Sequence, residues 1–390
     1  MKEKILKFIE ICFVAGLALI VFAGLGRALF APKEINWSEN RPANILPGFT
    51  ASSFMSAEYQ DGVESALADQ IHGAEMMKSQ YNKRVTGLTL SVLTNFLHQD
   101  PEYPYAYNGI LIVGGDRLLY YPKTLTDKVK AALAQRAEEI NTLVQADPGP
   151  EYFLWFIEKE TDINFRSGNH MGHYEYFSSL LDTSLMKIGV DTVDSYEDYC
   201  RRFYKTDHHW NHVGAYEGYV ELMDFLGISE ELISPEEEFL VGTGMTGSKA
   251  TVTRSAGILT EDMYAYRFAF PELSISINAA PSEDYGYQNM AWPYSLTYGG
   301  YYGEDHGEIV FDTGREELDN ILVIGDSYDN AILKLMAGHY NRTYSVDLRY
   351  YEHFLGEKFE LSDYVEENDI DKVLIIGSVN FYSSEDFSMR

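Results

Sequence analysis

The sequence predicts an α/β protein with a mostly parallel sheet, preceded by one long apolar helix. Short apolar runs alternate along the chain with segments in which apolar residues recur at helical spacing. One of these runs leads directly into the turn Gly325-Asp326-Ser327 and then into a helix-compatible stretch. The first 30 residues contain an uncharged, mostly apolar run over residues 11–26. Strand–helix–strand alternation of this kind is typical of a parallel sheet with helices on its faces.

The composition excludes several classes of protein. The 390 residues include 60 Asp and Glu against 30 Lys and Arg, a formal net charge of -30. So acidic a chain lacks the basic surface that binding to nucleic acid requires, and we expect no nucleic-acid partner. With 45% hydrophobic residues the chain can build a core, and its length allows one large domain or two. Two cysteines, Cys12 and Cys200, exclude a disulfide scaffold and a multi-cysteine metal site.

The N-terminal 30 residues are predicted to be a membrane anchor or a signal peptide. Lys2, Lys4 and Lys7 precede the apolar run and Arg27 follows it, which would place the N-terminus in the cytoplasm and the rest outside. With its flanks the segment reaches the roughly 20 residues that span a bilayer. An uncleaved single-pass anchor in the cell membrane is favoured over a cleaved signal, which would leave the protein secreted. Residues 31–56 read as a linker, and residues 57–390 as the main domain.

The first half of the main domain is predicted to hold the following elements. A helix covers residues 57–82, with Val63, Leu67, Ile71 and Met76 at near-helical spacing. A β-hairpin follows over 109–121 around a glycine turn, and then a long amphipathic helix over 123–145. A buried strand over 152–157 precedes a helix over 174–188. A further helix over 213–226 is expected to be capped by Asn211.

The second half adds an inserted β-rich region at about 233–318, where short β-like runs such as 274–278 and 308–311 stand among many Gly and Tyr residues. The α/β alternation then resumes. Strands are predicted over 320–324, 344–348 and 372–376, with a helix over 361–368 between the last two.

The turn at Ser327 is the first candidate site. A serine at a strand-to-helix turn lies exposed at the carboxyl edge of the sheet, and free N–H groups at the helix start can hold an oxyanion. The simpler interpretation is that Ser327 only caps the helix, which is the commonest role of a serine there.

The second candidate is the segment 204–212, which is rich in histidine. Asp207 and His209 are two residues apart and can face the same side, as a carboxylate and the imidazole that it orients must. Alternatively, His208 and His212 lie four residues apart and would form a plausible zinc pair on a helix, although no further ligands are evident. A third interpretation is a polar turn before the helix. The Asp–His interpretation is preferred over the metal.

These two segments carry a resemblance to a known family. The tetrad Asp207-His208-His209-Trp210, followed downstream by Gly325-Asp326-Ser327, resembles the DHHW protein family. Residues 346–351 and the last strand leading to Asn380 match more weakly. The family is similar to the SGNH-hydrolase-like domain of alginate O-acetyltransferases, and the resemblance covers roughly residue 50 to the end. It implies a three-layer α/β/α fold. It also implies Ser327 as nucleophile, His209 as general base and Asp207 as its orienter, with His208 outside the triad.

The resemblance further implies an extracytoplasmic O-acetyltransferase that moves acetyl from Ser327 to hydroxyls of a polysaccharide, with neither cofactor nor metal. A membrane-bound O-acyltransferase would supply the acetyl group. Oxyanion donors would be the N–H of Ser327 or Tyr328 together with Arg349 or Asn380. Tyr382, Trp210 and Tyr328 could stack on a glycan, although core packing of these rings and a surface salt bridge of Arg349 are equally open. The alternatives are an acetyl-esterase with the same triad and a non-catalytic glycan-binding or assembly subunit.

Overall fold

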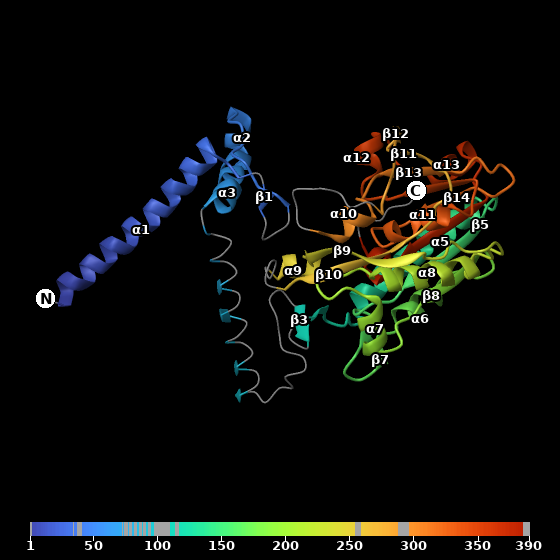
Figure 1. Ribbon diagram of the computed structural model, residues 1–390, viewed down its shortest axis with the longest axis horizontal. Helices are drawn as coiled ribbons and strands as arrows, with labels where there is room; N and C mark the ends of the chain where they lie inside the picture. The colour runs from blue at the N-terminus through green and yellow to red at the C-terminus, as the bar shows by residue number, and fades with distance from the viewer. Residues whose placement is uncertain are drawn as a thin grey trace. The chain divides into compact units, whose positions relative to one another are not determined.

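The computed structural model describes residues 2–33, 35–36, 41–71, 73, 77, 80–81, 84–85, 88, 91–92, 95–96, 110–113, 117–253, 259–287 and 296–384. The chain forms two compact units (Figure 1). The first contains the N-terminal 118 residues with two short later segments, and the second contains most of the chain from Leu119 to the C-terminus.

The first unit begins with the predicted apolar helix, α1 (Lys2–Phe30). Within the described residues, only its portion Ile5–Phe30, with a mean hydropathy of 2.5, is long and apolar enough to cross a membrane. A signal sequence and an anchor both fit this helix. The other elements of the unit are short: β1 (Ile35–Asn36), β2 (Arg41–Pro42), α2 (Ala51–Met55), α3 (Glu58–Gln70), β3 (Ile110–Val113) and α9 (Ser248–Val252).

Two predictions concern this part of the chain. The helix predicted over 57–82 is present as α3 up to Gln70, and Met76 lies outside the described residues. The predicted hairpin is confirmed, because β3 pairs with β4 (Arg117–Tyr120), while its turn at 114–116 is outside the described residues.

An eight-stranded sheet forms the centre of the second unit, in the order β12-β11-β13-β15-β14-β16-β5-β8. Five strands are parallel: β15 (Arg342–Val346), β14 (Ile321–Ile324), β16 (Lys372–Gly377), β5 (Glu151–Ile157) and β8 (Met186–Asp191). Three antiparallel strands extend one edge: β13 (Glu308–Asp312), β11 (Ser274–Ile277) and β12 (Ala280–Ser282). The predicted mostly parallel α/β sheet is therefore confirmed, and strands from the predicted β-rich region join it.

Side chains of β5 show that helices cover both faces of this sheet. Leu154 and Phe156 belong to a buried core that includes Ile140 of α5 (Asp127–Ala146). The alternate residue Trp155 instead contacts Phe225 of α8 (His212–Phe225), with ring centroids 5.0 Å apart. Because successive side chains of a strand point to opposite faces, α5 and α8 lie on opposite sides of the sheet. This is the three-layer arrangement that the resemblance implied.

The remaining elements of the second unit are short. They are β6 (Ile163–Asn164), β7 (Asn169–His170), α6 (His173–Ser178), α7 (Tyr196–Arg202), β9 (Glu237–Met245), β10 (Glu261–Arg267), α10 (Tyr298–Tyr302), η2 (Asp329–Ala331), α11 (Leu333–Ala337), α12 (Tyr351–Leu355), α13 (Leu361–Glu367) and α14 (Val379–Tyr382). Strands β9 and β10 form a separate antiparallel ribbon.

One predicted helix is wrong in its second half. The segment 174–188 was expected to be helical throughout, but only α6 is helical and the chain then enters strand β8. Strand β8 pairs with β5 in parallel, with Gly189 opposite Trp155. A Cβ at Gly189 would lie 2.5 Å from the Trp155 ring, so the missing side chain lets that ring cover the edge strand. Long-range pairing overrides the local helical pattern here.

The sheet topology explains where polar side chains gather. Strands β14, β15, β16 and β5 are parallel neighbours, so their carboxyl ends meet at one edge of the sheet. Ser327 follows β14, Arg349 follows β15, Asn380 follows β16 and Lys159 follows β5. Ligand sites in open α/β sheets lie at this edge.

Candidate active site

A pocket of about 260 Å³ opens at this carboxyl edge. The ends of all four strands contribute to it, and His208 comes from the loop before α8. Among its lining residues are Lys159, Ser327, Tyr328, Arg349, Ser378 and Asn380. The pocket therefore brings together residues that are far apart in the chain, including four of the site residues that the sequence predicted.

The loop that carries the histidines is closed at its base. Residues Phe203 and Trp210 form an isolated antiparallel bridge, and the N–H of Tyr204 donates to the carbonyl of His209 at 3.2 Å. Directly after the loop, the side chain of Asn211 accepts hydrogen bonds from the second and third N–H groups that follow it, at 2.9 and 3.1 Å. The predicted cap of α8 is thus confirmed. These contacts fix where the loop starts and ends.

Glu261, at the start of β10, is hydrogen-bonded to the loop that carries the histidines. Its carboxylate accepts hydrogen bonds from the N–H of Lys205 at 2.9 Å and from the N–H of Thr206 at 2.7 Å. The hydroxyl of Thr206 donates to the same carboxylate at 2.7 Å. Such charge-assisted bonds are about twice as strong as neutral ones. The sequence reasoning missed Glu261, because nothing local links it to a loop more than 50 residues away.

Asp207, His209 and Ser327 form one continuous chain of hydrogen bonds. Nδ1 of His209 lies 2.6 Å from Oδ1 of Asp207, and Nε2 of His209 lies 2.7 Å from Oγ of Ser327. The same Asp207 oxygen also accepts the backbone N–H of His209 at 3.0 Å. Asp207 and His209 are buried, whereas Ser327 is partly exposed at the pocket. A serine nucleophile, a general base and a carboxylate that orients the base require this geometry.

Two tyrosines fix the plane of the His209 ring. Tyr298, from α10, stacks on His209 with ring centroids 3.8 Å apart and an angle of 5° between the planes. The Tyr328 ring lies at 5.0 Å, and the Tyr328 hydroxyl donates to the backbone carbonyl of His208. The imidazole therefore has little freedom to turn away from Ser327. Tyr298 was not predicted from the sequence, where it is one of many tyrosines in the β-rich region.

The two predicted backbone oxyanion donors, the N–H groups of Ser327 and Tyr328, differ in their hydrogen bonds. The N–H of Tyr328 donates to Oδ1 of Asp326 at 3.1 Å and is therefore occupied. By contrast, the N–H of Ser327 forms no hydrogen bond within the described part of the chain. A 3₁₀ turn, η2, follows the serine in place of the α-helix that was expected to start there. Of the two predicted backbone donors, only the Ser327 N–H is therefore without a hydrogen bond among the described residues.

Arg349 and Asn380 both line the pocket, as predicted, but both already have partners. The Arg349 guanidinium binds the carboxylate of Asp347 through two nitrogens and Asp305 at 3.2 Å. Oδ1 of Asn380 accepts a hydrogen bond from Nζ of Lys123 at 3.2 Å. This bond directs the carbonyl side of the Asn380 amide to Lys123, and its NH₂ group has no hydrogen bond among the described residues.

Tyr382 and Trp210, two of the predicted glycan-stacking residues, are core residues instead. Tyr382 is fully buried, and its hydroxyl donates to the carbonyl oxygens of Trp155 and Ile375 at 3.0 and 3.1 Å. Trp210 is 1% exposed and packs on α8, where a Cβ at Gly218 would lie 2.7 Å from its ring. Neither ring presents a face to a ligand, so both assignments are corrected. Tyr328 lines the pocket, but only 2% of it is exposed.

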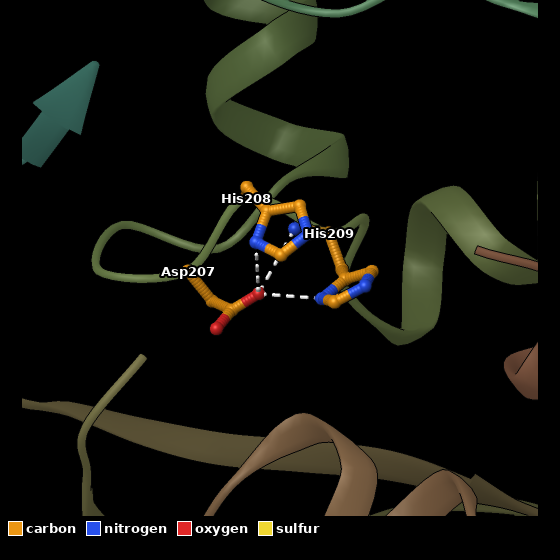
Figure 2. A group of neighbouring side chains, drawn as sticks. All are labelled: Asp207, His208 and His209. Carbon is orange, nitrogen blue, oxygen red and sulfur yellow. Dashed lines mark hydrogen bonds and ion pairs between the residues drawn. The ribbon is translucent and has the colours of Figure 1, made fainter. Parts of the chain in front are cut away.

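The metal alternative rests on the group in Figure 2. Asp207, His208 and His209 offer ligand atoms within 4.8 Å of one another, and Nδ1 of His208 lies 3.6 Å from the Asp207 carboxylate (Figure 2). The other member of the proposed zinc pair, His212, instead contacts Glu238 at 3.2 Å. A metal on His209 Nδ1 would break the 2.6 Å bond to Asp207. The geometry thus fits the hydrogen-bonded chain better than a metal centre.

Three carboxyl groups near Ser327, those of Asp326, Asp329 and Asp347, have raised pKa values. Burial raises the pKa of Asp326, against the opposing effect of the Tyr328 N–H bond. Burial likewise raises the pKa of Asp347, and it raises that of Asp329 well above the ordinary value with further help from Asp326. Burial alone would lower the pKa of Arg349, but its bonds to Asp347 outweigh this and raise it. Arg349 therefore stays charged and neutralises part of this acidic group.

Comparison with solved structures supports the fold. Two structures of Bacillus cereus PatB1, one of them with a sulfonyl adduct, share 22% and 20% identity with this chain at TM-scores of 0.56 and 0.55. Each match covers 72% of this chain, and 99% and 96% of the respective PatB1 chains.

Two further solved structures are similar to this chain. A DHHW family protein from Eubacterium siraeum shares 15% identity at a TM-score of 0.55, covering 72% of this chain and 94% of that chain. The O-acetyltransferase domain of Pseudomonas putida AlgJ shares 10% at 0.41, covering 71% and 93%.

Sequence comparison finds one family for part of the chain. No curated protein matches the chain. The model of the DHHW protein family matches residues 161–346, which include both the histidine loop and Ser327. Residues 161–346 thus match the DHHW protein family, and the structural matches show that the covered part of the chain has the fold of the PatB1 and DHHW family protein structures.

Proposed function

We propose that this protein is an extracytoplasmic O-acetyltransferase, which moves acetyl groups onto hydroxyls of a cell-surface or secreted polysaccharide. The observation that carries this proposal is the unbroken chain of hydrogen bonds from Asp207 through His209 to Ser327. It ends on a partly exposed serine that lines a pocket at the carboxyl edge of a parallel sheet. That arrangement can form and break an acyl-enzyme without a metal or cofactor.

In the first step, Oγ of Ser327 attacks the carbonyl carbon of an acetyl ester while Nε2 of His209 takes the hydroxyl proton. The carbonyl oxygen becomes an oxyanion. When this tetrahedral intermediate collapses, the leaving oxygen of the donor takes the proton from His209, and acetyl remains on Ser327. Asp207 holds Nδ1 of His209 and stabilises the imidazolium that forms between the two proton transfers.

The second step repeats the first with a new nucleophile. A hydroxyl of the acceptor sugar gives its proton to His209 and attacks the acetyl carbonyl. Ser327 then leaves with that proton, and the acetylated sugar departs. If water takes the place of the sugar, the same residues give an esterase, which is why the esterase remains the second candidate.

The proposed oxyanion donors are the N–H of Ser327 and the side-chain NH₂ of Asn380. The first has no partner among the described residues, and the second lies in the same pocket with its carbonyl side held by Lys123. Two preorganised donors are typical of acyl-transfer sites, and each is worth about 10²- to 10³-fold in rate.

The location and the acetyl donor form part of the proposal. We place the second unit outside the cell membrane with α1 as a single-pass anchor, because basic residues precede the apolar run. The donor would be a membrane-bound O-acyltransferase. One PatB1 structure carries a sulfonyl adduct, and since sulfonyl fluorides react with activated hydroxyls, we expect the same class of reagent to modify Ser327.

The test uses the full chain in detergent with 4-nitrophenyl acetate as donor and short neutral and acidic glycans as acceptors. We expect acetylated glycan to form, at a rate that falls at least about 100-fold in Ser327→Ala. Ser384→Ala, which removes another serine of the pocket wall, is the matched control and should keep its activity. Release of free acetate alone, whatever the acceptor, would favour the esterase. Unchanged activity in Ser327→Ala would refute Ser327 as the nucleophile, and the absence of both acetylated glycan and released acetate with the wild-type chain would favour the scaffold interpretation.

A further inference from the structure

Lys159 is a buried cation without an anionic partner. It lies in the loop after β5, is 2% exposed and lines the same pocket as Ser327. Its ammonium group lies 5.2 Å from the centroid of the Tyr328 ring. Within the described part of the chain, this ammonium forms neither a hydrogen bond nor an ion pair.

An arrangement of this kind is costly for the folded state. Removing a charge from water is costly unless a partner compensates it, and a cation–π contact offsets only a small part of that cost. Lysines are almost never fully buried unless they are paired. A ligand bound in the pocket would therefore be the missing partner of Lys159.

The surrounding charges do not supply that partner. Of the two carboxylates in the pocket wall, Asp347 is bound by Arg349. Asp326 accepts the Tyr328 N–H and forms no ion pair with Lys159; Lys159 lowers the pKa of Asp326, but burial raises it by more and so disfavours the ionised form. Asp162, behind the loop, accepts bonds from the Lys159 backbone N–H and from His173.

A second ammonium group, that of Lys123, is bonded to Asn380, which lines the pocket. Nζ of Lys123 binds Oδ1 of Asn380 at 3.2 Å and Oγ of Ser383 at 2.8 Å. The pKa of Lys123 is lowered by burial and by repulsion from Lys159, against the opposing effect of Asp162. The two lysines are thus close enough to repel each other. Two cations, Lys123 and Lys159, thus lie near Asn380 in a protein whose net charge is -30.

We propose that the pocket takes an anionic substituent of the acetyl acceptor, a sugar carboxylate or phosphate, with Lys159 as its counter-ion. The inference rests on the proposed function and names its substrate class as an acidic polysaccharide. A lysine ammonium suits this task because it is a compact point charge with three donors. The anion would hold the acceptor while a neighbouring hydroxyl reaches the acetyl group on Ser327.

The experiment separates binding from chemistry. In the full chain carrying Ser327→Ala, which cannot form an acyl-enzyme but retains Lys159, binding is measured by ligand-detected NMR titration. Two matched pairs differ chiefly in charge: trigalacturonate against its methyl ester, and galactose 6-phosphate against galactose. We expect one acid to bind at least about tenfold more tightly than its neutral partner, and the pair that responds identifies carboxylate or phosphate.

Variants locate the effect. Adding Lys159→Met should abolish the preference for the acid, and Lys159→Arg should retain it. Lys187→Met, which removes an exposed lysine paired with Glu151 on the same unit, is the control and should change nothing. Equal or absent binding of the acids and their neutral partners would overturn the proposal even if the Lys159 variants do not fold. So would a preference that survives Lys159→Met. Failure of the proposed function would appear separately, as an unreactive Ser327 in the wild-type chain.

Discussion

Glu261 provides the sharpest structural prediction, because three hydrogen bonds to one carboxylate hold the loop that carries Asp207 and His209. Glu261→Ala removes all three. The site is half-buried, so water replaces part of each bond, and we take about 1 kcal/mol for each backbone N–H and somewhat less for the hydroxyl. Local protection of the loop should fall by about 2–3 kcal/mol, which corresponds to about 30- to 140-fold faster exchange.

Hydrogen exchange of the peptide that contains Lys205 and Thr206, followed by mass spectrometry, measures this directly. Glu237→Gln is the matched control, since Glu237 lies on the neighbouring strand β9 and forms an exposed pair with Arg267. Such a pair contributes at most about 1 kcal/mol, so exchange of the loop should not change. Exchange in Glu261→Ala within about threefold of wild type would refute the role assigned to the carboxylate.

Three further predictions concern the surroundings of the triad. Tyr298→Leu removes the ring stacked on His209 and should slow acylation of Ser327 about tenfold. Tyr298→Phe keeps the stacked ring, so its acylation rate should stay within about threefold of the wild-type rate. Equal effects of the two substitutions would contradict the stacking role. Asn211→Ala removes two cap bonds and should destabilise the start of α8 by about 1 kcal/mol in thermal denaturation, and no loss would contradict the cap. Burial, and then Asp326, raise the pKa of Asp329 well above its ordinary 3.8, so the folded state keeps a proton that the unfolded state releases. Stability from this group is then greatest below about pH 4 and is lost as the pH rises through the folded pKa. The thermal stability of Asp329→Asn relative to wild type should therefore increase from pH 4 to pH 8, and a constant difference would contradict the shifted pKa.

Most of the sheet could be predicted from the sequence, because its parallel strands are short apolar runs with clear boundaries. Strands β5, β14, β15 and β16 all lie where the apolar runs indicated. The edge strand β8 was missed because its sequence also fits a helical pattern, and only pairing with β5 decides between the two. Local patterns carry no information on such pairing.

The same distinction holds for the site. Asp207, His209 and Ser327 could be proposed because their motifs are local and because a family resemblance supported them. Tyr298 and Glu261 could not, because their roles arise only when distant segments meet. Lys159 did have a signal, since a polar run directly after a buried strand lies at the edge where ligands bind. The burial of Tyr382 and Trp210 could not be inferred, because an aromatic residue serves core and surface alike.

The most direct test of the central claim is to treat the full chain in detergent with methanesulfonyl fluoride and to map the adduct by peptide mass spectrometry. The hydrogen-bond geometry predicts one rapidly formed adduct, on Ser327, at a rate that falls at least about 100-fold in His209→Ala. His208→Ala removes the neighbouring imidazole, which lies outside the chain of bonds to Ser327, and should change the rate by less than about threefold. Modification spread over several serines, or an unchanged rate in His209→Ala, would contradict the claim that Asp207, His209 and Ser327 act together.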